Sequence, residues 1–281
     1  MITQKLRPRT LTRAAFLALA LATLTVWPGT TRSAPDALRI AVASNFVPTL
    51  RVLVEDYASV STHPITLSAA STGKLYAQIK QGAPFDLLLA ADHVRPQRLH
   101  AEGLSQRPFT YAVGQLVLWR PNERTPCALV DQATLGRPPA EEQITAWLSQ
   151  SERIAVAVPE LAPYGMAARQ AIDQLGLSSD LERRIVRAEN IGQTFSMVAT
   201  GNADAGLIAR AQLNALLNNR DPDDRCASDV LPLPTRLHTP ILQNASILLS
   251  GRNPEASRAF ADYLRSERAK NIIIRWGYLS P

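Results

Sequence analysis

Cysteine and histidine are scarce in this chain, and their scarcity excludes several kinds of metal site. The 281 residues include two cysteines, Cys127 and Cys226, and four histidines. Two cysteines are too few for the common four-ligand zinc site, and the histidines show no metal-ligand spacing. In an oxidising compartment, an isolated pair favours a disulfide between Cys127 and Cys226. Two independent thiols remain the alternative, because the sequence does not place them within bridging distance.

The motifs of two enzyme classes are also absent. The segment Ser71-Thr72-Gly73-Lys74 is similar to the end of a P-loop, but position 68 holds Ser where that loop requires Gly. No Gly-x-Ser-x-Gly nucleophile elbow occurs. Asp86 and Asp92 flank a predicted strand and leave an acid–base or metal role open, although carboxylates at strand ends more often act as caps or lie in solvent. The sequence therefore predicts a protein that is not an enzyme.

The N-terminal segment has the pattern of a secretory signal. Residues 1–34 hold five basic residues and no acidic one, and an apolar run from Ala14 to Trp27 follows the basic head. A membrane-spanning helix needs about 20 apolar residues. The run here is shorter and is ended by Pro28-Gly29. We therefore predict that residues 1–34 are a signal peptide and not a permanent membrane anchor. We therefore expect the remaining chain to lie in the periplasm.

Removal of this segment changes the charge of the protein. The whole chain has a formal net charge of +6, and without the five basic residues of the signal the charge is +1. The basic character that would suggest nucleic-acid binding is therefore mostly a property of the signal. We expect no nucleic-acid partner.

The rest of the chain alternates short apolar runs with helix-like segments. Strands are predicted at residues 38–43, 65–69, 85–90, 111–119, 154–158, 184–187, 205–209 and 241–249. Helices are predicted at residues 47–57, 73–80, 94–102, 165–175, 191–200, 210–218 and 254–275. This alternation, interrupted once by a loop-rich stretch at 120–139, predicts an α/β fold of two units, each with a parallel sheet flanked by helices.

Small polar groups gather at four of the strand-to-helix junctions. In open α/β sheets, ligands bind beyond the carboxyl ends of strands, where helix N-termini offer unpaired N–H groups and a positive dipole end. Hydroxyl groups add further donors, so these junctions together favour an uncharged anion site. Taken singly, each Ser, Thr or Asn at such a junction is more often an ordinary helix cap than a ligand group. The candidate residues are Ser44, Asn45, Ser71, Thr72, Tyr164 and Ile191.

These junctions lie in segments that resemble the periplasmic molybdate-binding proteins of ABC transporters, within the type II solute-binding fold. The matching segments are 42–46, 71–86, 89–92, 109–119, 162–165, 190–191 and 201–206. The similarity extends over roughly residues 37 to 279, nearly all of the mature chain.

The resemblance implies a two-lobed α/β protein with the ligand cleft between the lobes. Lobe 1 would comprise residues 35–115 and 235–281, and lobe 2 residues 116–234. It also implies a monomeric, extracytoplasmic subunit of an ABC importer that binds molybdate or tungstate, needs no cofactor and is recognised by a membrane permease. The same fold with another anion (sulfate, phosphate or a small organic anion) remains the alternative.

The resemblance also assigns ligand positions. In order along the chain they are Asn45 with Ser44 beside it, Thr72 with Ser71 beside it, Tyr164, and the backbone amide of Ile191. One position departs from the family pattern. Some members place a ligand-contacting Tyr after the strand that here ends at Ile208, where this chain has Ala209. Either Tyr164 supplies the aromatic hydroxyl instead, or the pocket is altered.

Overall fold

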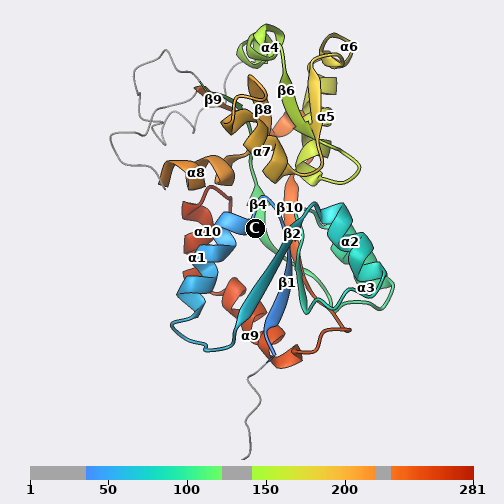
Figure 1. The fold of residues 1–281 in the computed structure, drawn as a ribbon, viewed down its shortest axis with the longest axis vertical. Coiled ribbons are helices and arrows are strands. Elements are labelled where there is room, and N and C mark those ends of the chain that lie inside the picture. The colour runs from blue at the N-terminus through green and yellow to red at the C-terminus, as the bar shows by residue number, and fades with distance from the viewer. Residues whose placement is uncertain (1–35, 122–140, 219–228) are drawn as a thin grey trace, which may run out of the picture. The chain divides into compact units, whose positions relative to one another are not determined.

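The computed structural model describes residues 36–121, 141–218 and 229–281, and these residues form two five-stranded sheets (Figure 1). The predicted signal peptide over residues 1–34 lies outside the described residues. Cys127 and Cys226 lie outside them as well, so their pairing stays a prediction. Within the described ranges, no helix is both long and apolar enough to cross a membrane.

Sheet 1 has the strand order β2-β1-β3-β10-β4. Its strands are β1 (Leu38–Ala43), β2 (Ile65–Ala70), β3 (Leu87–Leu89), β4 (Phe109–Gly114) and β10 (Ile241–Ile247). Strand β1 pairs in parallel with β2 and β3, whereas β10 is antiparallel to β3 and β4. The apolar run of β1 is almost wholly buried, as expected for a strand covered on both faces.

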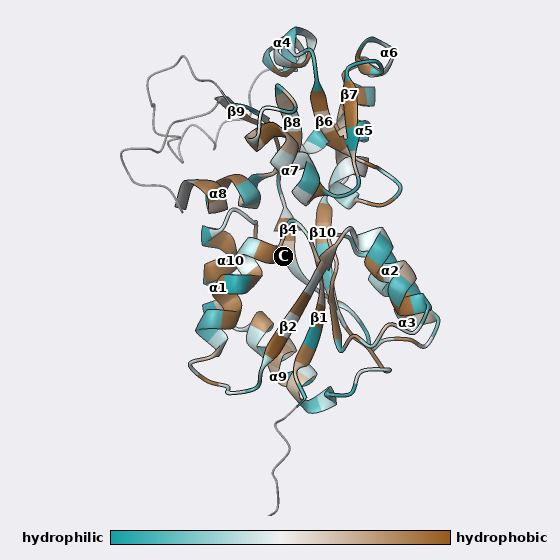
Figure 2. Ribbon diagram, viewed as in Figure 1, coloured by the Kyte–Doolittle hydropathy of each residue, from teal (hydrophilic) through white to brown (hydrophobic). Residues whose placement is uncertain are grey.

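Helices cover both faces of sheet 1. They are α1 (Val47–Tyr57), α2 (Thr72–Lys80), α3 (Val94–Ala101), α9 (Pro254–Arg265) and α10 (Glu267–Arg275). One apolar cluster joins the sheet to α1, α9 and α10, and a second joins its other face to α2 and α3. In Figure 2 the helices α1 and α2 each show hydrophilic and hydrophobic residues, as expected for helices that pack one side against a sheet. We call sheet 1 with these helices lobe 1.

Sheet 2 repeats this arrangement with the order β7-β6-β8-β5-β9. Its strands are β5 (Leu116–Arg120), β6 (Ile154–Ala157), β7 (Ile185–Ala188), β8 (Ala205–Ala209) and β9 (Asp229–Pro232). Strand β6 is parallel to β7 and β8, and β5 is antiparallel to β8 and β9. The helices are α4 (Glu141–Gln150), α5 (Pro163–Gln174), α6 (Ser178–Leu181), α7 (Ile191–Ala199) and α8 (Arg210–Asn218). We call this unit lobe 2. The predicted α/β fold with two helix-flanked sheets is confirmed, and both sheets are mixed.

Two predicted elements are wrong in a similar way. The single strand expected over 111–119 is two strands, β4 and β5, which belong to different sheets and are separated by Gln115. The single helix expected over 254–275 is also two, α9 and α10. Ser266 separates them with an extended backbone, and its side chain accepts a hydrogen bond from the N–H of Ala269. Serine at a helix N-cap stabilises such a break.

Gln115 lies where the chain passes from lobe 1 to lobe 2. The side-chain amide of Gln115 donates to the backbone carbonyl of Gly277 at 2.9 Å, and the backbone carbonyl of Gln115 accepts from the backbone N–H of Arg210 at 3.0 Å. The chain returns to lobe 1 between β9 and β10 through a short 3-10 helix, Thr235–Leu237. Gln115 is therefore held by a residue of lobe 2 and by the C-terminal segment at once.

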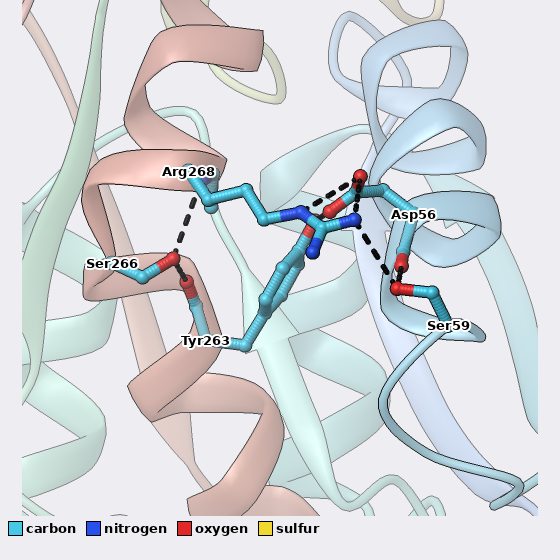
Figure 3. A network of polar contacts seen from close by, with 6 residues as sticks. Asp56, Ser59, Tyr263, Ser266 and Arg268 are labelled. Atoms are coloured by element: carbon cyan, nitrogen blue, oxygen red, sulfur yellow. Dashed lines mark hydrogen bonds and ion pairs between the residues drawn. The ribbon is translucent and has the colours of Figure 1, made fainter.

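A polar network fixes the C-terminal helices against α1 (Figure 3). The Tyr263 hydroxyl and the Arg268 guanidinium each donate to the Asp56 carboxylate at 2.7 Å. These two donors lower the pKa of Asp56, so its charge persists in acid. The chain's last helices, more than 200 residues from α1, are thereby attached to lobe 1.

Candidate functional site

The six candidate residues line one small cavity. It lies at the carboxyl ends of β1 and β2 and at the N-termini of α2, α5 and α7. Ser44, Asn45, Ser71 and Thr72 come from lobe 1, and Tyr164 and Ile191 from lobe 2. The structure thus brings together all the residues that the sequence indicated. The remaining lining residues are Ala43, Ala70, Ala91, Ala162 and Pro163.

Two of the cavity hydroxyls accept hydrogen bonds within lobe 1. The Ser71 hydroxyl caps helix α2 by accepting from the N–H of Lys74 at 3.4 Å. The Thr72 hydroxyl accepts from the N–H of Ala91 at 3.0 Å. Both side chains are almost fully buried. A hydroxyl has one proton to donate in addition to its acceptor lone pairs, so each of these protons is left for another acceptor.

The other two cavity hydroxyls accept hydrogen bonds across the lobes. The Ser44 hydroxyl, after β1, accepts from the N–H of Gly192 in α7 at 3.1 Å. The Tyr164 hydroxyl, in the first turn of α5, accepts from the Gln243 side-chain amide of β10 at 3.1 Å. Among the described residues, none of the four cavity hydroxyls donates to a protein group. Four residues that line this cavity therefore carry a hydroxyl whose proton is not given to another described protein group.

Helix starts add backbone donors to the cavity. Thr72 and Ile191 are the first residues of α2 and α7, and Tyr164 is the second residue of α5. The first N–H groups of a helix have no partner within the helix. The N-caps of α2 and α7 bond to later residues, leaving these N–H groups unused. Three helix N-termini, with their partial positive charge, therefore meet at one point.

The Asn45 side chain does not offer a free donor. It is fully buried, and its amide nitrogen donates to Gln243 at 3.0 Å and to the Tyr278 hydroxyl at 3.1 Å. The Tyr278 hydroxyl in turn donates to the Asn45 carbonyl at 3.0 Å. The side chain thus fixes the shape of the loop after β1. The backbone amide of Asn45 is therefore the group of this residue that could donate to a ligand.

Gln243 connects these groups and was not predicted. Its carbonyl oxygen accepts from Asn45 and from the Tyr111 hydroxyl, and its amide nitrogen donates to Tyr164. Gly114 leaves room for this contact, because a Cβ there would collide with the Tyr164 hydroxyl and approach the Gln243 amide at 2.8 Å. A sequence signal existed, since Gln243 is a polar residue in the middle of a buried strand.

The cavity is electrically neutral at physiological pH. Its lining contains no Asp, Glu, Lys, Arg or His. Burial raises the pKa of Tyr164 well above its ordinary value, so the hydroxyl keeps its proton. In the part of the chain that the structure describes, no cluster of three or more His, Cys, Asp or Glu could hold a metal ion. The site consists of neutral donors alone and suits a ligand that only accepts hydrogen bonds.

The two aspartates that left an enzymatic role open lie outside the cavity lining. Asp86 is fully buried and accepts from the backbone N–H groups of Arg39, Arg252 and Asn253. Burial alone would raise its pKa, but these hydrogen bonds outweigh burial and lower it. Asp92 accepts from the backbone and side chain of Arg95 in the first turn of α3. Both carboxylates therefore have structural partners.

Ala209 also lies outside the cavity lining. It ends β8, and its N–H donates to the Gln212 side chain at 3.3 Å. The amide nitrogen of Gln212 donates to the carbonyl of Ile191 at 3.2 Å, which orients the start of α7. Among the described residues that line the cavity, Tyr164 is the one aromatic residue.

Comparison with known proteins identifies the family. Residues 38–279 match the sequence model of the family described as bacterial extracellular solute-binding protein. The chain belongs to this family. Because its members bind solutes and are not enzymes, membership confirms that this protein is not an enzyme.

Two curated members are particularly similar. The molybdate-binding protein ModA of Azotobacter vinelandii is 33% identical over 243 residues, covering 86% of this chain and 89% of the relative. The molybdate-binding protein ModA of Rhodobacter capsulatus is 32% identical over 275 residues, covering 97% of this chain and 98% of the relative.

Solved structures place the fold among the type II periplasmic binding proteins. The periplasmic molybdate-binding protein of Azotobacter vinelandii superposes with a TM-score of 0.72 and 31% identity, over 87% of this chain and 99% of that one. The sulfate-binding protein SubI of Mycobacterium tuberculosis H37Rv has a TM-score of 0.65 at 12% identity, with 87% of each chain covered, and shares the fold alone. The predicted two-lobed type II fold is confirmed.

Proposed function

We propose that the protein is the extracytoplasmic solute-binding subunit of an ABC importer and that it binds molybdate or tungstate without a cofactor. The residues that would hold the anion are Ser44, Asn45, Ser71, Thr72, Tyr164 and Ile191. The observation that carries this proposal is the uncharged cavity between the lobes, which is lined by four hydroxyl-bearing residues and by the first residues of three helices. The two ModA relatives support the choice of ligand.

The donor set suits a fully deprotonated oxyanion. Such an anion only accepts hydrogen bonds, and each bond to a charged oxygen is about twice as strong as a neutral one. Neutral donors also avoid the desolvation of a buried counter-charge. A protonated anion such as hydrogen phosphate would turn one O–H toward donors and lose a bond, so the cavity disfavours phosphate.

The size of the cavity would provide the remaining selectivity. Molybdate and tungstate carry the same charge as sulfate but are larger, so a cavity that fits the larger anions leaves sulfate with longer hydrogen bonds. Molybdate and tungstate are nearly alike in size and charge, and the donor set treats both alike. Sulfate, phosphate and small organic anions are the alternative ligands that an experiment must include.

The division of the site between two lobes supports a closing motion. Lobe 1 would comprise residues 35–115 and 235–281, and lobe 2 residues 116–234. The two connections at Gln115 and between β9 and β10 would act as the hinge, and the lobes would close over the anion. A membrane permease would then recognise the closed monomer. Residues 1–34 would direct the protein to the periplasm as a signal peptide, and a Cys127–Cys226 disulfide is compatible with that compartment.

Thermal unfolding with different anions tests this function. The protein without residues 1–34 is heated with molybdate, tungstate, sulfate, phosphate or a small organic anion, each at matched ionic strength. A ligand at about 100 times its dissociation constant adds about 2.7 kcal/mol to the free energy of unfolding. For a chain of this size, this corresponds to a rise in Tm of about 5–10 °C.

Each outcome distinguishes one ligand class from another. A rise with molybdate and tungstate alone supports the proposal and the argument from size. A rise with sulfate, phosphate or the organic anion instead would keep the binding fold and replace the ligand. If no anion shifts Tm, the cavity is not an oxyanion site, and the proposed function is refuted.

A further inference from the structure

A glycine in each lobe reaches across to the other lobe beside the cavity. The N–H of Gly73 in α2 donates to the carbonyl of Leu161 at 2.9 Å. The N–H of Gly192 in α7 donates to the Ser44 hydroxyl at 3.1 Å. Each glycine is the second residue of its helix. In both lobes, therefore, the first helical residue lines the cavity and the next one contacts the opposite lobe.

Both contacts depend on the missing side chain. A Cβ on Gly73 would lie 3.0 Å from both the Cα and the carbonyl oxygen of Leu161. A Cβ on Gly192 would lie 3.2 Å from the Cβ of Ser44 and 3.0 Å from the side-chain oxygen of Asn190. These distances are shorter than ordinary contacts between carbon atoms. The opposing atoms at Leu161 belong to the backbone and have no rotamer by which to move away.

The helices themselves do not require these glycines. Neither residue has the left-handed φ that favours glycine. In a helix, alanine is more favourable than glycine, because glycine loses more backbone entropy on folding. Helical preference therefore opposes glycine at both positions, and the close approach of the lobes is the structural feature that requires it.

Two longer side chains also link the lobes near these glycines. Lys74 forms an ion pair with Glu189, and the Arg95 guanidinium donates to the carbonyl of Glu160 at 2.7 Å. The Lys74 and Glu189 side chains are each 43% exposed, so their pairing contributes little and depends on salt. Long side chains such as Lys74 and Arg95 can adjust and do not fix a distance between the lobes, whereas the backbone N–H groups of the two glycines are held by their helices.

We propose that Gly73 and Gly192 are positioning residues that set the spacing of the closed lobes and thereby hold the anion in place. This inference rests on the proposed function. Contacts made after the anion has entered slow its release, while its entry into the open cleft is unaffected. The two glycines therefore act on the dissociation rate, and an added methyl group at either one holds the cleft slightly open.

The test compares Gly73→Ala and Gly192→Ala with the parent protein and with Gln78→Ala. Gln78 is an exposed residue of α2, so its replacement changes helix propensity without touching lobe 2. For each protein, molybdate affinity is measured by titration calorimetry and both rate constants by stopped-flow fluorescence. The Tm of the anion-free protein is measured alongside.

We expect each glycine variant to bind molybdate about tenfold more weakly, as expected for the loss of one cross-lobe hydrogen bond. The dissociation rate should account for this change, and the anion-free Tm should be equal to or above that of the parent. Gln78→Ala should bind like the parent. A variant with parental affinity, a change confined to the association rate, or a lowered anion-free Tm would each overturn the proposal. A parent that binds no molybdate refutes the proposed function, and the proposed role of the glycines with it.

Discussion

Replacing Tyr164 by Phe isolates one hydroxyl at the centre of the site. The ring is buried in the core of lobe 2, so its packing survives the change. The variant loses one hydrogen bond to a charged ligand, worth about 1.5–3 kcal/mol. It also leaves the Gln243 amide without its acceptor when the lobes meet, which costs about 1–3 kcal/mol. Together these terms predict a loss of at least about 2.5 kcal/mol, or roughly 60-fold in affinity.

Tyr111→Phe provides the matched control. The Tyr111 hydroxyl is buried in the same network, where its one proton lies between two acceptors, the Ala90 carbonyl and the Gln243 side-chain carbonyl, both at 3.1 Å. Tyr111 does not line the cavity. Removal of its hydroxyl should lower Tm and change molybdate affinity little, because Gln243 keeps its bonds to Asn45 and Tyr164.

Titration calorimetry of both variants with molybdate gives the comparison. An affinity of Tyr164→Phe less than about tenfold below that of the parent would refute the assignment of this hydroxyl as an anion donor. An equal loss in both variants would place the effect in the network and not in the contact with the anion.

Further changes test other parts of the same reasoning. Thr72→Val should weaken molybdate binding by about 10- to 150-fold and lower Tm, because it removes a donor to the anion and the acceptor of Ala91; Thr72→Ser should restore both in calorimetry and thermal unfolding. Gly114→Ala should also weaken binding without touching the anion, since its methyl group displaces the Tyr164 hydroxyl; unchanged affinity would contradict this packing argument. Asp86→Asn should lower the free energy of unfolding in urea by about 3 kcal/mol at pH 7. Because the pKa of Asp86 is lowered in the folded protein, its carboxylate contributes to the free energy of unfolding above about pH 4, and this contribution disappears as the pH falls through the folded pKa. The free energies of unfolding of parent and variant should therefore become equal in acid. A difference that persists in acid would contradict this role of the carboxylate.

The sequence predicts strands well where apolar runs are continuous, as at Leu38–Ala43. It fails at Gln115, because periodicity records burial and does not reveal that a strand has left one sheet for another. The break at Ser266 was more accessible, since a serine followed by an acidic residue is a common helix start. Element boundaries that depend on neighbouring residues can therefore be predicted from the sequence. Boundaries that depend on pairing with a strand distant in the sequence cannot.

Part of the candidate site could also be predicted from the sequence, and part could not. The cavity residues follow strand ends, so the alternation of strands and helices predicts that they meet. Gln243 and Tyr278 were missed because they are 198 and 233 residues away from Asn45, the residue that they hold. Local pattern does not connect such distant positions. A polar residue within a buried strand, as at Gln243, is the one local sign that a buried network exists.

The neutral lining of the cavity has a consequence for the protein as a whole. The net charge of a complex is the sum of the charges of the protein and its ligand, corrected for any protons taken up or released on binding. Here the lining carries no ionisable group except a protonated tyrosine, so a bound dianion would add both of its negative charges without proton uptake by the lining. The formal charge of the mature chain would change from +1 to −1. The bound and free forms should therefore migrate in opposite directions in an electric field near neutral pH.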